Sequence, residues 1–161
     1  MGSGKTTIGR QLAKHLNRRF FDSDREIEAR TGAEISLIFE LEGEAGFRKR
    51  ERDMVDELTQ YPNIVLATGG GAVLNADNRR HLHERGHVVY LKAEIQQLYE
   101  RTAKDKSRPL LQTDNPQATI ARLLNEREPL YLEIAHSIIN TDEHSIRDIV
   151  KQITKQVHEP T

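Results

Sequence analysis

The stretch Gly2-Ser3-Gly4-Lys5-Thr6-Thr7 decides the fold, because it places two glycines, a lysine and two hydroxyl residues directly before an amphipathic segment. Glycines let backbone N–H groups converge on phosphate oxygens, and the N-terminus of a following helix adds partial positive charge. Lys5 then reaches the β- and γ-phosphates of a nucleotide, while the hydroxyl of Thr6 can bind Mg²⁺. The stretch therefore predicts the second half of a phosphate-binding loop, followed by a helix with an apolar face of Ile8, Leu12, Ala13 and Leu16.

The loop motif is incomplete at its start. In the full pattern G-x-x-x-x-G-K-[ST] the first glycine would precede Met1, and the strand that should lead into the loop is missing too. We therefore expect the natural product to begin about a dozen or fewer residues upstream. Two other interpretations stay open, a chance Gly/Ser turn and the N-myristoylation pattern Met1-Gly2-x-x-x-Thr6. The latter lacks the polybasic patch that would supply a second anchoring signal.

Charge and composition exclude several classes of protein. Lys and Arg number 24 against 25 Asp and Glu, so no overall field attracts nucleic acid or an anionic membrane. No apolar run approaches the length of about 18 residues that a membrane span needs, and no secretion signal leads the chain. The absence of Cys excludes disulfides, thiol catalysis and Cys-bound metal. We expect a single domain with a small lid, acting as a monomer in the cytoplasm, with neither nucleic acid nor membrane as partner.

Short apolar runs alternate with longer segments of helical periodicity. Ile64-Val65-Leu66-Ala67 is a continuous apolar run, which is typical of a strand buried on both faces. Further strands are expected at 19–21, 87–91 and 138–139. Helices are expected after a cap at Ser23 or Asp24, over 35–41 and 44–59, and from about Glu94, Pro116, Pro129 and Ser145. This alternation predicts an α/β fold with a parallel sheet and helices on both faces.

Polar and glycine-rich segments follow two of these strands. Asp22-Ser23-Asp24 comes after the first strand, and Thr68-Gly69-Gly70-Gly71 comes after Ala67. Because strand ends line the ligand crevice in parallel α/β sheets, one carboxylate can lie near Mg²⁺ and the other near an acceptor hydroxyl. The glycines permit a ligand to approach the backbone closely. A helix N-cap and a flexible loop remain the alternative interpretations of the two segments.

One predicted helix carries a possible carboxylate-binding group. In Glu44-x-x-Phe47-Arg48-x-x-Glu51, Phe47 can floor a pocket and Arg48 can form a bidentate pair with a ligand carboxylate. Glu51 lies three residues further on, within reach to orient Arg48. The alternative is that Arg48 belongs to the basic run at 48–52 on a solvated helix surface.

Two further segments contain candidate arginines. The polar stretch 104–114, which follows Arg101 and contains Arg108, is long enough to be a functional loop. A phosphoryl-transfer lid needs an arginine that closes onto the γ-phosphate. The segment Arg127-x-Pro129-Leu130-Tyr131 begins a later helix pair. A solvated linker and simple helix punctuation are the alternatives for these two segments.

Taken together, these motifs resemble the shikimate kinase family over essentially the whole chain. The resemblance rests on their order and separations: Gly2 to Thr7, Asp22-Ser23-Asp24, Gly43-Glu44-x-x-Phe47-Arg48-x-x-Glu51, Ala67-Thr68-Gly69-Gly70-Gly71, Arg108-Pro109-Leu110-Leu111 and Arg127-x-Pro129-Leu130-Tyr131. It implies a three-layer P-loop kinase fold with a parallel sheet in the order 2-3-1-4-5, helices on both faces and a mobile lid. The central strand 1 is not in this sequence. Residues 1–161 would form one such domain, with a substrate-binding region at about 24–60 and the lid at about 104–114.

The resemblance also implies a role for each site residue. ATP would be bound by Gly2, Ser3, Gly4, Lys5, Thr6, Thr7, Arg101, Arg108 and, in the adenine-edge loop, His144. Mg²⁺ would be bound by Thr6 directly and by Asp22 through water. Shikimate would contact Asp24, Phe47, Arg48, Gly69, Gly70, Gly71 and Arg127. Asp24 would act as the base, with Lys5 and Arg108 as the other catalytic residues.

The implied reaction is transfer of the γ-phosphoryl group of ATP to the 3-hydroxyl of shikimate. A related P-loop enzyme, such as a gluconate kinase-like protein, is the nearest alternative, because its acceptor is also a hydroxylated carboxylate. A non-catalytic nucleotide-binding module has no need of an acceptor pocket. An inactive, N-terminally truncated form is a third possibility, because loss of a central strand leaves neighbouring backbone groups unpaired.

Overall fold

Two pairs of parallel strands form the centre of the computed structural model, which describes residues 4–94, 115–142 and 144–158. Strand β1 (Arg19–Asp22) pairs with β2 (Ile64–Ala67), with Arg19 opposite Ile64. Strand β3 (Val89–Lys92) pairs with β4 (Ser137–Asn140), with Val89 opposite Ser137. The prediction of parallel strands at these four places is confirmed.

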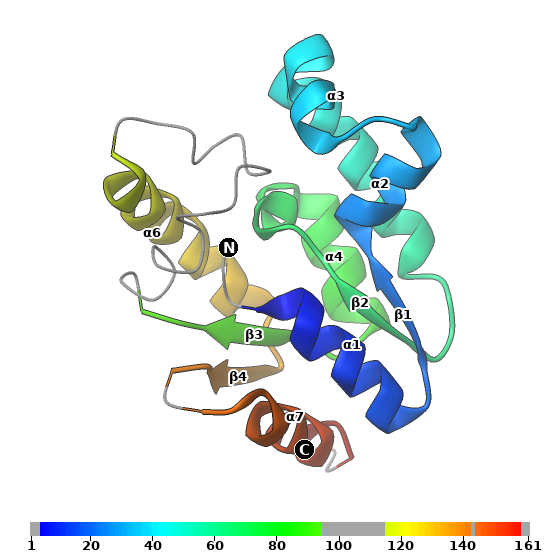
Figure 1. Cartoon of the computed structure of the whole chain (residues 1–161), viewed down its shortest axis with the longest axis vertical. Helices are drawn as coiled ribbons and strands as arrows, with labels where there is room; N and C mark the ends of the chain where they lie inside the picture. Colours follow the sequence, from blue (N-terminus) through cyan, green and yellow to red (C-terminus); the bar gives the residue numbers. More distant parts are fainter. Residues whose placement is uncertain (1–3, 95–114, 143, 159–161) are drawn as a thin grey trace.

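Helices cover both faces of the strands (Figure 1). They are α1 (Lys5–Leu16), α2 (Ser23–Thr31), α3 (Ile35–Leu58), α4 (Ala76–Arg85), α6 (Pro116–Ile134) and α7 (Ile146–His158). Val65 and Leu91 pack against α1 and α7, whereas Leu66 packs against α3. Tyr90 contacts Tyr131 of α6 with ring centroids 5.0 Å apart. Because successive strand residues point to opposite faces, α1 and α7 lie on one face and α3 and α6 on the other.

An apolar cavity of about 460 Å³ separates the two strand pairs. Val65 and Leu66 of β2 line one side, and Val89 and Leu91 of β3 line the other. Within the part of the chain that the structure describes, no hydrogen bond joins β2 to β3, so each pair is a two-stranded sheet.

The break expected between the helical segments 35–41 and 44–59 is confirmed, because α3 leaves helical geometry at Gly43, where φ is +73°. Glycine adopts this left-handed backbone without the steric penalty that other residues meet. The prediction that a helix begins at Pro129 is wrong, because Pro129 lies inside α6. A proline inside a helix removes one backbone hydrogen bond, and the buried face of α6, which includes Ile120, Leu123 and Ile134, maintains the helix across that position.

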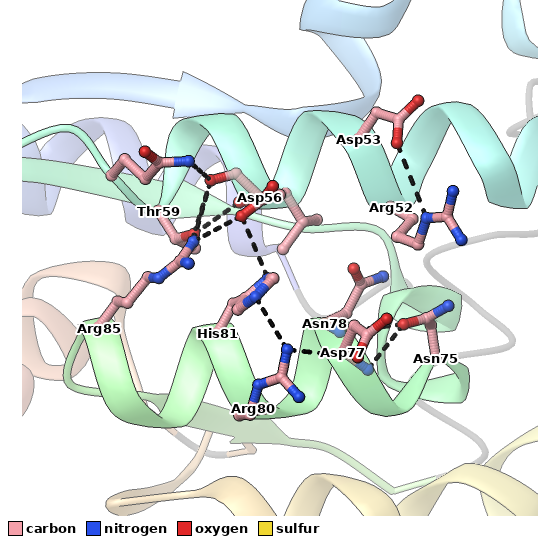
Figure 2. Close-up of polar contacts among 12 residues, drawn as sticks. Arg52, Asp53, Asp56, Thr59, Asn75, Asp77, Asn78, Arg80, His81 and Arg85 are labelled. Atoms are coloured by element: carbon pink, nitrogen blue, oxygen red, sulfur yellow. Dashed lines mark hydrogen bonds and ion pairs between the residues drawn. The ribbon is translucent and has the colours of Figure 1, made fainter.

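A polar cluster joins the C-terminal half of α3 to α4 (Figure 2). Arg85 Nη1 donates to the Asp56 carbonyl oxygen at 3.1 Å, to Asp56 Oδ1 at 2.8 Å and to Thr59 Oγ1 at 2.9 Å. His81 Nδ1 lies 3.5 Å from the same carboxylate oxygen. The hydrogen bond from Arg85 and the nearby His81 hold the pKa of the Asp56 carboxyl below its usual range. The cluster fixes α3, which carries Arg48, against α4.

The start of α4 is fixed in a second way, through the turn that precedes it (Figure 2). The Asn75 side chain accepts from the backbone N–H groups of Asp77 at 2.8 Å and Asn78 at 3.1 Å, which caps the helix. The buried Asn78 side chain donates to the Ala72 carbonyl oxygen at 3.0 Å. The glycine-containing turn after β2 is thereby attached to α4.

Among the described residues, no helix combines the length and apolarity that crossing a membrane would require.

Helix α3 offers a matched test of the core. Leu58 is fully buried, whereas Leu41 of the same helix is 73% exposed. We expect Leu58→Ala to lower the free energy of unfolding by about 2–5 kcal/mol, because it leaves a cavity. Leu41→Ala should change it by less than about 0.5 kcal/mol. Urea unfolding followed by circular dichroism measures both, and an equal loss in the two variants would contradict this assignment of the core.

Candidate active site

Asp22, at the end of β1, connects the phosphate-loop helix to the helix that carries Asp24. Its Oδ2 accepts from the Thr6 hydroxyl at 3.0 Å. Its Oδ1 accepts from the backbone N–H of Asp24 at 3.0 Å and of Arg25 at 3.3 Å. The N-cap of α2 is therefore Asp22, and the prediction of Ser23 or Asp24 as the cap is wrong. The extended backbone of the last strand residue lets its carboxylate reach the first turn of the helix.

The first turn of α1 presents the candidate phosphate-binding groups. Gly4 precedes the helix with φ at +79°, and Lys5, Thr6 and Thr7 follow as its first residues. Neither a side-chain cap nor an acidic residue occupies this described first turn. Its backbone N–H groups and the helix dipole therefore suit an anion. Gly2 and Ser3 lie outside the described residues, as do Arg101, Arg108 and the whole stretch 104–114.

Asp24 lies against the turn that follows β2. A Cβ atom placed on Gly69 would be 3.0 Å from Asp24 Oδ1, which is tighter than ordinary packing. The segments after β1 and β2 can approach this closely because residue 69 has no side chain. The charge of Asp24 also acts on Glu51 and contributes to raising its pKa. The structure thus brings together carboxylates from α2 and α3.

Arg48 and Glu51 form an ion pair on α3. Arg48 Nη1 lies 2.9 Å from Glu51 Oε1, as the spacing of three residues predicts, and Nη2 lies 3.4 Å from Glu44 Oε1. Glu51 is only 1% exposed. Burial raises the pKa of the Glu51 carboxyl, and the charges of Arg48 and Arg127 oppose that rise. The pair holds the Arg48 guanidinium in one orientation.

The main chain of the glycines after β2 lies directly against this guanidinium. A Cβ atom on Gly71 would overlap the Arg48 guanidinium. Residues Gly70–Leu74 form a 3₁₀ helix, in place of the flexible loop that was the alternative interpretation. Phe47, the other candidate on this helix, is buried in a core cluster with Ile27 and Ile38, and its ring centroid lies 5.3 Å from Arg48 Cζ. Phe47 therefore anchors this part of α3, beside Arg48, in the core.

Arg127 is a buried cation on α6. It is 4% exposed, so the alternative of a solvated arginine is wrong for this residue. Its Nε has no hydrogen-bond partner within the described parts of the chain, and the same holds for Arg48 Nε and Glu51 Oε2. Buried polar atoms without partners are rare in folded proteins and often mark a binding site. Two of these atoms are donors, so the pocket suits an anion.

The last candidate residue is His144, in the segment expected to form the adenine-edge loop. It is exposed in the segment before α7, and no hydrogen bond or ion pair of its side chain is found within the described chain. Conversely, sequence reasoning assigned no role to Tyr131, whose hydroxyl donates to the Gly70 carbonyl oxygen at 2.7 Å. The signal for it was present, because a spacing of four residues puts Tyr131 on the same helix face as Arg127.

Comparison with known proteins finds that this chain is similar to shikimate kinases. The family model described as "Shikimate kinase" matches residues 1–158. A shikimate kinase from Burkholderia pseudomallei (strain 1710b) is 60% identical over 157 residues, covering 98% of this chain and 85% of the relative. One from Nitrosococcus oceani is 55% identical over 159 residues, covering 99% of this chain and 84% of the relative.

Solved structures agree with the sequence matches. A structure of shikimate kinase from Acinetobacter baumannii in complex with shikimate is 51% identical, with a TM-score of 0.96, and the match covers 98% of this chain and 88% of that one. The crystal structure of shikimate kinase from Bacteroides thetaiotaomicron is 34% identical, with a TM-score of 0.89, covering 99% and 94%. The chain therefore belongs to the shikimate kinase family, which uses ATP and acts in the shikimate pathway.

Proposed function

We propose that the chain transfers the γ-phosphoryl group of ATP to the 3-hydroxyl of shikimate, giving shikimate 3-phosphate and ADP, at the site built by α1, α2, α3, α6 and the turn after β2. The observation that carries this proposal is the pair of cations formed by buried Arg127 and half-buried Arg48, whose charges act on Glu51 together with that of Asp24. The Nε atoms of both arginines are buried donors without a partner in the described chain, and such donors need an acceptor. A carboxylate acceptor supplies one, and Asp22 links this pocket to the phosphate loop through Thr6.

The two halves of the reaction use separate groups. Lys5, Thr6 and Thr7, with Gly4 and with Gly2 and Ser3 ahead of it, bind the phosphates of ATP at the N-terminus of α1. Lys5 stabilises charge on the transferring group, as does Arg108, which lies outside the described residues. On the acceptor side, Arg48 and Arg127 hold the carboxylate of shikimate.

Asp24 orients the acceptor hydroxyl and accepts its proton. Its position supports this role, because it begins α2 directly after the residue that contacts Thr6, and it lies against the Gly69 backbone. The main chain of Gly69, Gly70 and Gly71 forms the wall that faces the acceptor.

Mg²⁺ fits the oxygen atoms at the start of this site. The Thr6 hydroxyl donates a hydrogen bond to Asp22 Oδ2 at 3.0 Å, which leaves the lone pairs of the hydroxyl oxygen available to a cation. No cluster of three or more His, Cys, Asp or Glu suitable for a metal exists within the described chain. A cation held by few protein oxygens and by nucleotide phosphates is typical of Mg²⁺. Thr6 and Asp22 would hold the ion, which neutralises charge on the phosphates when bound.

The arrangement of the strands supports the family's sheet order, 2-3-1-4-5, for this protein. In that order β1 and β2 are strands 2 and 3, and β3 and β4 are strands 4 and 5. A strand between β2 and β3 would pair with both, and the apolar cavity lined by these two strands has the lining that a central strand requires.

A coupled assay of ADP release tests the proposed reaction. We expect shikimate to stimulate ADP release and gluconate, an acceptor of similar chemistry, to fail. The assay uses the chain as given and a version with the expected strand and loop glycine added before Met1. Acceptor dependence in neither version, or equal stimulation by both acids, would contradict the proposal.

Arg48 and Arg127 give a prediction on binding. Because charge-assisted hydrogen bonds contribute about 1.5–3 kcal/mol each, Arg48→Ala and Arg127→Ala should each weaken shikimate binding about tenfold or more. Binding of ADP should change less than twofold. Isothermal titration calorimetry measures both affinities, and Arg52→Ala, an exposed position on the same helix, is the matched control. An equal loss of both affinities would remove the arginines from the acceptor site.

Asp24 gives a prediction on turnover. Asp24→Asn keeps the shape of the side chain but removes the base, so kcat should fall by about 10²–10⁴-fold while ADP binding is retained. Steady-state kinetics measures this, with Asp53→Asn on the exposed surface of α3 as the control. A variant with full activity would show that Asp24 is not the base.

A further inference from the structure

Tyr131 makes the hydrogen bond that connects α6 to the glycine wall, the main chain of Gly69, Gly70 and Gly71. Its hydroxyl donates to the Gly70 carbonyl oxygen at 2.7 Å, across 61 positions of sequence. Burial raises the pKa of the Tyr131 phenol, and the charge of Arg127 acts in the opposite direction. The phenol therefore keeps its proton and remains a donor to Gly70 over the whole physiological pH range.

Tyr131 also lies one helical turn after Arg127, on the same face of α6. The charge of the Arg127 guanidinium acts on the phenol oxygen. The hydrogen bond of Tyr131 thus holds α6, which carries the cation proposed for the acceptor carboxylate, against the backbone proposed for the pocket wall.

The hydrogen bond fixes a peptide group that borders the pocket. A peptide unit is planar, and in its trans form the C=O and N–H bonds point in opposite directions. Because Tyr131 holds the carbonyl of Gly70, the N–H of Gly71 is turned away from α6. Gly71 is the residue on which the Arg48 guanidinium lies. One hydroxyl therefore sets the position of the Gly70–Gly71 peptide relative to α6, which carries Arg127.

We infer that Tyr131 is a positioning residue for the acceptor, holding Arg127 and the Gly70–Gly71 peptide in the geometry that binds the acid before the acid arrives. The inference rests on the proposed acceptor site and assigns a further residue to it. It predicts an effect on the acid and none on the nucleotide, because the described partners of Tyr131, the Gly70 carbonyl and the Tyr90 ring, lie outside the first turn of α1. Removal of the hydroxyl leaves the peptide free to reorient, so binding must then include the cost of ordering it.

Tyr90 provides a matched control. Its ring lies 5.0 Å from that of Tyr131, and its hydroxyl donates to Glu128 Oε2 at 2.8 Å on α6. Tyr90→Phe and Tyr131→Phe therefore delete the same group from neighbouring rings, and only one of these groups contacts the glycine wall.

The experiment compares both variants by calorimetric titration with shikimate and with ADP, by thermal melting, and by steady-state kinetics. We expect Tyr131→Phe to weaken shikimate binding about tenfold and to raise the KM for shikimate more than it lowers kcat. Binding of ADP should stay within twofold, and Tyr90→Phe should leave both affinities within twofold. In the double variant Tyr131→Phe/Arg127→Ala, the loss should be smaller than the product of the two single effects.

The outcomes separate this inference from the proposed acceptor site. If Arg127→Ala weakens shikimate binding and Tyr131→Phe does not, the site stands and the role of Tyr131 is overturned. Loss of the folded state in Tyr131→Phe, or an equal loss of ADP and shikimate affinity, would make Tyr131 a residue of the core and would also overturn it. If neither variant affects shikimate binding, the proposed acceptor site itself is wrong.

Discussion

The carboxylate of Asp22 fixes the distance between the two halves of the site. One of its oxygens accepts from the Thr6 hydroxyl in α1, and the other accepts from the first backbone N–H groups of α2. A buried carboxylate is stable only when its oxygens have such partners. The first turns of α1 and α2 are therefore positioned by the same side chain, which stands at the end of β1. The phosphate-binding end and the candidate base cannot move independently.

Much of the fold could be predicted from local patterns. The apolar run at 64–67 and the glycines after it gave a strand and its end, and the alternation of strands with helices gave parallel pairing. Local patterns could not select the cap of α2, because Asp22, Ser23 and Asp24 are all good cap residues. That choice depends on where β1 ends, which is set by pairing with β2, a segment more than forty residues away. The position of Pro129 inside α6 similarly depends on tertiary packing.

The candidate site also has features that the sequence predicts and features that it does not. The Arg48–Glu51 pair lies within one helix, so its spacing was sufficient to predict it. The burial of Arg127 was not predictable, because a lone arginine on a helix is usually solvated. The burial of Arg127 results from the position of α6 beside the turn after β2, where Tyr131 contacts Gly70. Contacts between distant segments carry no signal in a single sequence, and here they distinguish a surface arginine from a buried one.

The glycines of the pocket also limit how this enzyme can escape an inhibitor. A compound that bound the main chain of Gly69 and Gly71 would contact atoms that every amino acid shares. A side chain at Gly71 would displace the Arg48 guanidinium, and one at Gly69 would crowd Asp24. Both groups belong to the proposed acceptor site, so resistance mutations at these two positions would also impair the natural substrate. Drug-resistant variants would have to arise in other parts of the pocket.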